Sequence, residues 1–399
     1  MRIAFYAPLK PPHHANPSGD RYLARLLIRA MEEAGHEVEL AASLRSRDSG
    51  GDVLRQKRLD RIGRKLAERY VRRLENRPDS ERPDLWFTYH LYYKAVDWIG
   101  PHVCRALEIP YVVAEASVAH KRVGGPWDYS HWALLDALNL VEGVVTLNPH
   151  DAGCIPDHVP SWHLPPFIPS GLFSGAADQV MENRKTITGR YNLRSDRPIM
   201  ACVAMMRPGD KLESYRALSA ALRGMPDLQW QLLVIGDGQA RSDVEEAFRW
   251  AGQDKVVFTG RLEQAELAQT LSACDLYVWP AIREAFGMAF LEAQAAGLPV
   301  VAGNAGGVSS VVADNATGIL TTEGDVAGFA SAVRLLLTTP AKRRGYAEAA
   351  RQRIASHHDL TVGAQRLDAI LTAARRNYVA PGLPLFDFAH SPTRNRPDE

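Results

Sequence analysis

The sequence alternates between two periodicities along almost its whole length, and this alternation restricts the fold more than any other feature. Short runs rich in β-branched and aromatic residues are each followed by about ten to twenty residues with apolar side chains at helical spacing. The pattern is typical of βαβ units, whose parallel strands are buried under helices. We therefore expect an α/β protein built from doubly wound parallel sheets.

The strand-like runs form two groups. In the first half they are Arg2–Tyr6, Glu37–Ala41, Leu85–Tyr89, Tyr111–Ala114 and Val144–Leu147. In the second half they are Ile199–Met205, Gln231–Ile235, Val256–Thr259, Leu276–Trp279, Val300–Ala302 and Gly318–Leu320. Intervening segments such as Asp20–Ala34, which Gly35 ends, have helical spacing. Each group predicts one sheet.

A proline-rich stretch at 165–171 separates the two groups, because proline lacks a backbone donor and restricts its neighbours. We expect one domain over 1–168 and a second over 169–360. A C-terminal helix at 361–380 is expected to pack back on the first domain. Residues 381–399 form a polar, proline-containing tail that can bury little apolar area.

Composition excludes several classes of protein. Of the 399 residues, 46% are hydrophobic, which argues against a disordered or fibrous chain. The chain has 47 Lys and Arg residues and 46 Asp and Glu residues, so its net charge is only +1. Such a small net charge does not attract nucleic acid to the molecule as a whole. The four cysteines lie far apart without CxxC pairs, which disfavours disulfides and zinc and favours a cytoplasmic enzyme. We find neither a signal peptide nor an apolar run long enough to span a membrane.

The most informative segment is the run from Arg283 to Ala293, which follows the expected strand Leu276–Trp279. It puts Glu284 in a loop and Glu292 inside a helix that begins near Gly287. Free amides at such a helix start stabilise a phosphate or a negative oxygen, and glycine lets a ligand approach the backbone. The alternative is that Glu284 only interacts with the helix N-terminus and that Glu292 lies on a solvated face.

Three other strand ends carry suitable chemistry. Arg207 and Lys211 follow the first strand of the second domain and can clamp a diphosphate, unless they serve only surface solubility. Gly236 and Gly238 follow the next strand, and Gly260 follows the third. Ligands of doubly wound sheets bind at such carboxyl ends, so these residues together predict a nucleotide-diphosphate site.

This ordered set, with Glu284 and Glu292 separated by seven residues, resembles the retaining glycosyltransferases of family 4. The resemblance covers about residues 1–376, more strongly in the second domain. It implies the GT-B fold, in which two Rossmann-like domains face each other across a cleft. It also implies transfer of a sugar from a nucleotide-diphosphate sugar to an acceptor hydroxyl.

The resemblance also implies residue roles in the second domain. Arg207 and Lys211 would neutralise the donor diphosphate, while Glu284 would contact the donor sugar and Glu292 the ribose hydroxyls. The backbone amides of Phe286, Gly287 and Met288 would face sugar or phosphate. The turn Gly260, Arg261 and Leu262 would border the base, beside the turn that holds Gly236 and Gly238.

In the first domain the resemblance is looser. Gly19 is the candidate for the family's glycine loop, with Ser18 or Asp20 as the helix cap. The family often has a histidine after the strand that here reads Tyr111–Ala114. Either Glu115 replaces that histidine or His120 reaches the same space. His90, after another strand, is a candidate for acceptor contact.

A basic amphipathic helix is expected at 55–77, a segment that contains ten Arg or Lys residues and only three acidic residues. Its outer face is either simply solvated or a docking surface for anionic lipid or a charged acceptor. The second interpretation allows peripheral membrane contact, at the inner membrane surface, without insertion.

The expected enzyme is a retaining hexosyltransferase that needs no cofactor besides its donor substrate. The chain has no Asp-x-Asp pair, so we expect a metal-independent reaction. The acceptor, either lipid-linked or a small molecule, and the base of the donor stay open. The alternatives are a nucleotide-sugar epimerase of GT-B architecture and a non-catalytic nucleotide-sugar-binding protein. A nicotinamide dehydrogenase is disfavoured because no GxGxxG follows the first strand.

Overall fold

The computed structural model describes residues 1–15, 18–75, 77–252, 254–285 and 287–378. The chain divides into two compact units. Unit 1 contains Met1–Thr146, Asp151–His163 and the chain from Arg366 onward, and unit 2 contains Leu147–His150 and Leu164–Gln365. Each unit holds one six-stranded sheet in which all pairs are parallel. The expected α/β class with two doubly wound sheets is confirmed.

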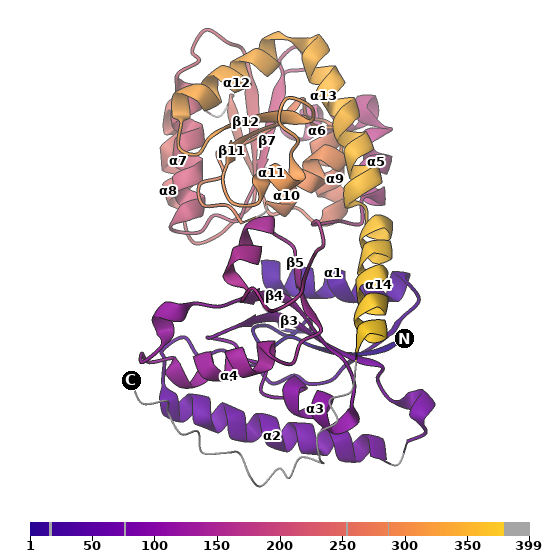
Figure 1. Cartoon of the computed structure of the whole chain (residues 1–399). Helices are drawn as coiled ribbons and strands as arrows, with labels where there is room; N and C mark the ends of the chain where they lie inside the picture. Colours follow the sequence, from indigo (N-terminus) through magenta and orange to yellow (C-terminus); the bar gives the residue numbers. More distant parts are fainter. Residues whose placement is uncertain (16–17, 76, 253, 286, 379–399) are drawn as a thin grey trace. The chain divides into compact units, whose positions relative to one another are not determined.

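The sheet of unit 1 has the strand order β2-β1-β3-β4-β5-β6. Its strands are β1 (Arg2–Tyr6), β2 (Glu37–Leu40), β3 (Leu85–Tyr92), β4 (Tyr111–Ser117), β5 (Gly143–Thr146) and β6 (Ser161–His163). Its helices are α1 (Gly19–Glu33), α2 (Val53–Glu75), α3 (Gly100–Leu107), α4 (Asp128–Leu138) and the later part of α14 (Leu360–Asn377). Figure 1 shows α2, α3 and α4 on one face of this sheet. Strand β6, a three-residue edge strand, was not expected from the sequence pattern.

Unit 2 has the strand order β12-β11-β10-β7-β8-β9. Its strands are β7 (Ile199–Val203), β8 (Gln231–Ile235), β9 (Val256–Gly260), β10 (Leu276–Trp279), β11 (Val300–Asn304) and β12 (Gly318–Thr322). Its helices are α5 (Gly171–Ala177), α6 (Val180–Arg190), α7 (Asp210–Arg223), α8 (Arg241–Phe248), α9 (Gln264–Ser272), α10 (Met288–Ala295), α11 (Val308–Val311), α12 (Val326–Thr338) and α13 (Pro340–Arg353). In Figure 1, α7, α8 and α12 lie on one face and α9, α10 and α13 on the other.

Strand order decides where ligands can bind in each unit. In unit 2, β7 continues through α7 toward β8, whereas β10 continues through α10 toward β11 on the opposite side. Because β7 and β10 are neighbours, the loops after them diverge, and ligands of doubly wound sheets bind at the carboxyl ends of such a strand pair. The corresponding neighbours in unit 1 are β1 and β3. Arg207 and Lys211 follow β7, Glu284 and Glu292 follow β10, and Gly19 follows β1, whereas His90 lies within β3. The other predicted site residues that the structure describes lie in β4 or at the end of β9, or follow β4, β8, β9 or β10.

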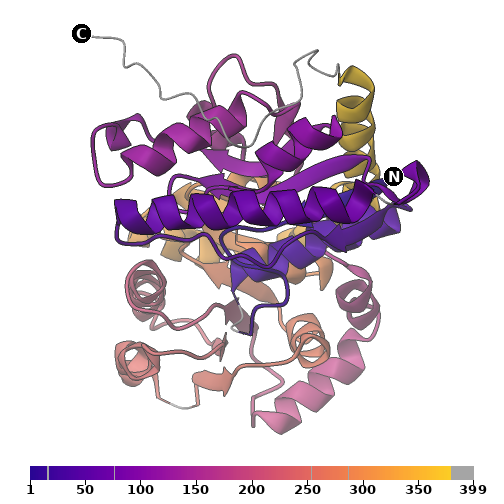
Figure 2. The same ribbon diagram turned by 90° about the horizontal axis from the view of Figure 1, so that it is seen from below.

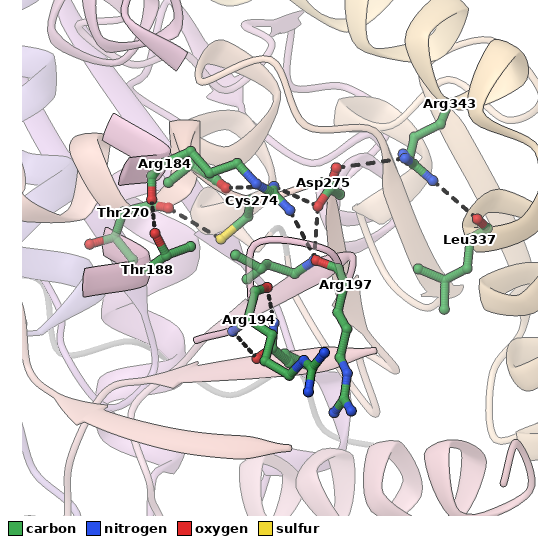
Figure 3. Close-up of polar contacts among 12 residues, drawn as sticks. Arg184, Thr188, Arg194, Arg197, Thr270, Cys274, Asp275, Leu337 and Arg343 are labelled. Carbon is green, nitrogen blue, oxygen red and sulfur yellow. Dashed lines mark hydrogen bonds and ion pairs between the residues drawn. The ribbon is translucent and has the colours of Figure 1, made fainter. Parts of the chain in front are cut away.

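At the opposite, amino end of the unit 2 sheet, a charged network holds the helices in place. Asp275 accepts hydrogen bonds from Arg184 Nη1 at 2.7 Å and from the Ile199 backbone at 2.8 Å, and Arg343 lies 3.6 Å from its other oxygen (Figure 3). Arg184 also donates to the carbonyl of Arg197 at 3.0 Å. These contacts join α6 and α13 to the starts of β7 and β10, far along the strands from the carboxyl-end loops.

Candidate active site

The loops after β7 and β10 bring Lys211 and Glu284 together. Lys211 is the second residue of α7, and its Nζ forms an ion pair with Glu284 Oε2. Trp279, the last residue of β10, donates from Nε1 to the same oxygen at 3.1 Å. The ammonium of Lys211 also lies 5.5 Å from the Trp279 ring centre, a cation–π distance. The Glu284 side chain is only 12% exposed, so its position is well defined by these neighbours.

The other predicted cation of unit 2 has no carboxylate partner among the described residues. Arg207 is exposed, and its Nη2 donates to Met205 Sδ at 3.3 Å. A guanidinium without a carboxylate is available for an anionic ligand. Arg207 and Lys211 therefore differ: the first is open to solvent, and the second is already engaged by Glu284.

Helix α10 begins at Met288, and Gly287 is its N-cap with a φ of 67° and no side-chain cap. A Cβ at Gly287 would lie 2.5 Å from the Phe290 ring, so glycine is required there for both conformation and space. The first amides of α10 therefore lack a capping side chain and can donate to a ligand. Phe286, also predicted to contribute its amide, lies outside the described residues.

The carboxyl group of Glu292, one turn into α10, has no hydrogen bond or ion pair among the described residues, and burial raises its pKa to about 7. The pKa of the Tyr277 hydroxyl is raised mainly by burial, then by Cys202, and further by the charges of Glu284 and Glu292. Both glutamates therefore lie within electrostatic range of the same hydroxyl. Since Tyr277 bonds to the backbone of Val203 at the end of β7, the pair shares the carboxyl edge of the sheet.

The glycines after β8 have a packing role of their own. A Cβ on Gly236 would lie 2.0 Å from the carbonyl oxygen of Ala204, and one on Gly238 would lie 2.3 Å from that of Met206. These turns therefore pack directly on the loop that leads to Arg207. Proximity to ligand is not needed to explain why both positions are glycine.

The turn after β9 is more open. Gly260 has a φ of 73°, Arg261 is exposed and lies 3.6 Å from Glu263, and Leu262 packs partly on the core. The structure therefore presents a charged side chain and a half-buried apolar one beside each other, at the carboxyl end of an edge strand.

In unit 1 the candidate residues gather where β1 and β3 are neighbours. His90 in β3 and Glu115 in β4 both have positive φ, 70° and 59°, which is unusual for residues other than glycine. The register pairs Tyr89 with Ala114 and Leu91 with Ala116, so His90 and Glu115 occupy matching positions of the two strands. Strained backbone of this kind is concentrated at functional sites.

Asp20 lies near this pair. Ser18, not Asp20, caps helix α1 by accepting from the Arg21 amide at 3.2 Å, which resolves the two caps expected from the sequence. Asp20 Oδ1 instead lies 3.6 Å from His90 Nδ1. Burial lowers the pKa of His90, and the charge of Asp20 partly opposes this. Gly19, the first residue of α1, is exposed, and a Cβ there would meet no atom within 4 Å.

His120 stands apart from this group. It begins a short 3-10 turn after β4 and is exposed, with its ring centre 6.3 Å from that of His131. His131 is fully buried, and burial lowers its pKa. Of the two alternatives for the family histidine, Glu115 has the position in the strand, whereas His120 lies further along the loop. In the described part of the chain, no three His, Cys, Asp or Glu residues converge as metal ligands.

Sequence reasoning missed several neighbours of Glu284. Trp279 could have been found, since it ends a strand just before the Glu284 loop. Ser214 on α7 and Glu323 after β12 also contact that loop, through the amides of Ile282 and Arg283. They come from distant sequence positions with no motif, and only the folded chain brings them together.

Comparison with known families gives a consistent result. A family model described as glycosyl transferases group 1 matches residues 183–353. A glycogen synthase of Mycobacterium tuberculosis is 28% identical over 326 residues, which cover 78% of this chain and 74% of that protein. A GDP-mannose-dependent monoacylated alpha-(1-6)-phosphatidylinositol monomannoside mannosyltransferase of Corynebacterium glutamicum is 29% identical over 222 residues, 54% of this chain and 56% of that protein.

Solved structures agree on the fold. A glycosyltransferase from Rickettsia africae superimposes with a TM-score of 0.73 at 16% identity, covering 94% of this chain and 98% of that one. HepE from Anabaena in complex with UDP superimposes with a TM-score of 0.67 at 17% identity, and the match covers 94% of this chain and all of that one. The GT-B fold expected from the sequence is confirmed. The comparisons show that the chain is similar to glycosyltransferases of group 1, and they do not favour the epimerase or the non-catalytic alternative.

Proposed function

We propose that this protein transfers a sugar from a nucleotide-diphosphate donor to an acceptor hydroxyl, with the donor held by unit 2. The observation that carries the proposal is the ion pair of Lys211 with Glu284, which joins the loops after the neighbouring strands β7 and β10. A cation and a carboxylate held beside an uncapped helix start can bind a phosphate and a sugar hydroxyl at the same time.

The diphosphate would replace Glu284 as the partner of Lys211 and engage the free guanidinium of Arg207. As the glycosidic bond breaks, negative charge grows on the leaving diphosphate. These cations and the first amides of α10 then bind it more strongly than in the ground state, which is what accelerates the reaction. Because they supply the positive charge, we infer that no divalent metal is needed.

The two glutamates would bind hydroxyl groups of the donor. Glu284, released from Lys211, is placed to accept from a hydroxyl of the donor sugar. Glu292 has no protein partner among the described residues, so its carboxyl is free for the ribose. The exposed turn Gly260–Leu262 is the proposed border of the base.

The acceptor would be bound by unit 1, where we propose His90 as a contact. We propose Glu115, with His120 as its alternative, as the catalytic group of unit 1, and Gly19 as a contact of the donor. We also propose retention of anomeric configuration, with an oxygen of the leaving phosphate removing the acceptor proton. A reducing compartment, the cytoplasm, suits the four cysteines, all of which are free thiols.

The activity is tested with a panel of nucleotide sugars and a cell extract as the source of acceptors, with products identified by mass spectrometry. We expect one donor to yield a glycosylated product and free nucleoside diphosphate, with unchanged yield in EDTA. Hydrolysis or epimerisation without acceptor would contradict the proposal.

Two variants test the roles in unit 2. Glu284→Gln keeps the shape of the side chain but removes its charge, and we expect kcat to fall by about 10²-fold. Lys211→Ala should weaken nucleoside diphosphate binding about tenfold, because a charge-assisted contact is lost. Lys185→Ala, at an exposed lysine of α6, is the matched control and should change neither quantity.

A surface contact with anionic membrane is a second proposal, which rests on helix α2. Its buried side includes Leu59, Tyr70 and Leu74, and Figure 2 shows the helix running along unit 1. Arg58, Arg61, Lys65 and Arg72 are exposed at spacings that place them on one stripe. Leu54 at its start is 75% exposed. Within the described residues no helix has both the length and the apolar character to cross a bilayer.

Flotation with vesicles tests this contact. We expect binding to vesicles containing phosphatidylserine or phosphatidylglycerol and loss of binding at high salt, because the attraction is electrostatic. Changing Arg58, Arg61 and Lys65 to Glu should abolish it. Changing Lys185, Arg223 and Arg344, three exposed cations of unit 2, should have no effect. Equal binding to neutral phosphatidylcholine would contradict the proposal.

A further inference from the structure

The loop between β10 and α10 has a strained backbone. Ala281 and Arg283 have φ values of 57° and 47°, in the left-handed region that residues with a Cβ avoid. Gly287 at the end of the loop is also left-handed. Such a conformation persists only where surrounding contacts impose it. The contacts that impose it here therefore decide where Glu284, the next residue after Arg283, is placed.

Two consecutive amides of the loop are bound by side chains from other elements. The Ile282 amide donates to Ser214 Oγ at 3.0 Å, and the Arg283 amide donates to Glu323 Oε1 at 2.8 Å. Ser214 is 1% exposed, and its hydroxyl in turn donates to the carbonyl of Asp210 at 2.9 Å. The hydroxyl is thus oriented with its lone pair toward the loop.

The other contacts of the loop do not explain its shape equally well. The side chain of Arg283 pairs with Asp210 at 2.5 Å, but these side chains are 66% and 50% exposed, so solvent screens the pair. The carbonyl of Ala285 accepts from the Gly307 amide at 2.7 Å, which holds the loop beyond Glu284. The backbone amides just before Glu284 are held by Ser214, which is buried, and by Glu323, which is exposed but bonds to the backbone directly.

We propose that Ser214 and Glu323 are positioning residues that hold the Glu284 loop in its strained conformation and so place the Glu284 carboxylate for transfer. Neither touches the donor in this proposal, and both act through the backbone of Ile282 and Arg283. The inference rests on the proposed function, because it gives Glu284 a role in the reaction.

Four variants provide the test. In Ser214→Ala the Ile282 amide loses its acceptor, and in Glu323→Ala the Arg283 amide loses its own. Glu323→Gln keeps an acceptor oxygen and should restore the bond. Ser219→Ala is the matched control for Ser214, because Ser219 is a buried serine of the same helix that bonds to Ala247 and Trp250 instead of the loop.

We expect kcat to fall about tenfold or more in Ser214→Ala and Glu323→Ala, since small displacements of a reacting group are costly. Affinity for a nucleoside diphosphate, measured by calorimetry, should stay within about twofold, because Arg207 and Lys211 are untouched. Glu323→Gln should retain most of the wild-type kcat. Ser219→Ala should lower thermal stability without lowering kcat. Wild-type kcat in both alanine variants, or equal losses in Glu323→Gln and Glu323→Ala, would overturn the inference.

A second readout separates this inference from the proposed function. Hydrogen exchange of the loop should speed up in Ser214→Ala and Glu323→Ala and stay slow in Ser219→Ala, whether or not a substrate is present. If the wild type transfers no sugar, the proposed function fails, and the exchange measurement still decides whether these two residues hold the loop. Unchanged exchange in both variants would refute their role.

Discussion

At Gly19 the need for glycine is not explained by the folded structure of the described residues. A Cβ there would meet no atom within 4 Å, and its φ lies outside the left-handed region. The protein's own packing therefore gives no reason for glycine. A ligand that approaches the backbone closely would give one.

We predict that Gly19→Ala leaves the melting temperature unchanged and lowers the rate of transfer about tenfold or more, because the methyl group would displace a bound substrate. The matched control is Gly175→Ala, at another exposed helical glycine with open space around its Cβ. It should not lower stability, because Ala favours a helix more than Gly does, and it should leave the rate unchanged. Normal turnover in Gly19→Ala would remove Gly19 from the proposed site.

Glu292 links stability to pH. Burial raises its pKa from an ordinary value of 4.5 to about 7, so the folded protein favours the neutral acid. This contribution to stability is complete below the unfolded pKa and is lost as the pH rises through 7.

Glu292→Gln should therefore match the wild type in stability near pH 4.5 and become the more stable protein above pH 7. The difference should be at most about 3 kcal/mol, at 1.4 kcal/mol per unit of pKa. Denaturant titrations at several pH values measure it. A difference that does not depend on pH would mean that Glu292 ionises normally.

At the scale of elements, the amino and carboxyl ends of the unit 2 sheet have different roles. Asp275 joins α6, α13, β7 and β10 at the amino ends (Figure 3). Removing one partner of a mostly buried charge network leaves the others unpaired, which is costly.

Asp275→Asn should destabilise unit 2 by about 3 kcal/mol and leave nucleoside diphosphate affinity unchanged. Asp227→Asn is the control, because Asp227 pairs with Arg334 on the surface, and we expect no resolvable shift of the unfolding midpoint. Loss of nucleotide affinity in Asp275→Asn, with the fold intact, would contradict a purely structural role.

The turn after β8 should behave differently from Gly19. A Cβ on Gly236 would lie 2.0 Å from the Ala204 carbonyl, so Gly236→Ala must push two loops apart. We predict a loss of stability of about 2 kcal/mol, as in other overpacked sites, together with weaker nucleotide binding because the Arg207 loop moves. Measured by thermal melts and calorimetry, stability and affinity should fall together. Unchanged stability would mean that the turn adapts.

At the scale of the whole molecule, the C-terminal part of α14 belongs to unit 1. Arg375 pairs with Asp84 at 2.7 Å, and Asp368 lies 3.1 Å from His36. Leu367 and Leu371 are fully buried. The chain thus returns to its first sheet after completing the second.

Truncation after Gln365 should therefore destabilise unit 1 more than unit 2, because it exposes apolar surface of unit 1. Limited proteolysis should cut within residues 1–163 first. Truncation after Tyr378 is the control and should leave both units resistant. Preferential cleavage within 164–365 in the shorter protein would contradict this assignment.

The sequence predicted the two-sheet α/β class because hydrophobic periodicity is a local signal that each βαβ unit repeats. It also predicted that Arg207, Lys211, Glu284 and Glu292 follow strand ends, since motif spacing is carried by the chain itself. It placed the ends of β3 and β4 too early, because His90 and Glu115 adopt left-handed conformations that their residue types disfavour.

Local pattern thus determined the strands of both sheets except β6, and which of them are followed by charged side chains. Tertiary structure alone decided that Lys211 pairs with Glu284 across two strands, that Ser18 rather than Asp20 caps α1, and that Ser214 and Glu323 hold the Glu284 loop. The physical reason is that side-chain pairing and backbone strain depend on atoms brought together from distant parts of the chain. Sequence periodicity contains no information about those distances.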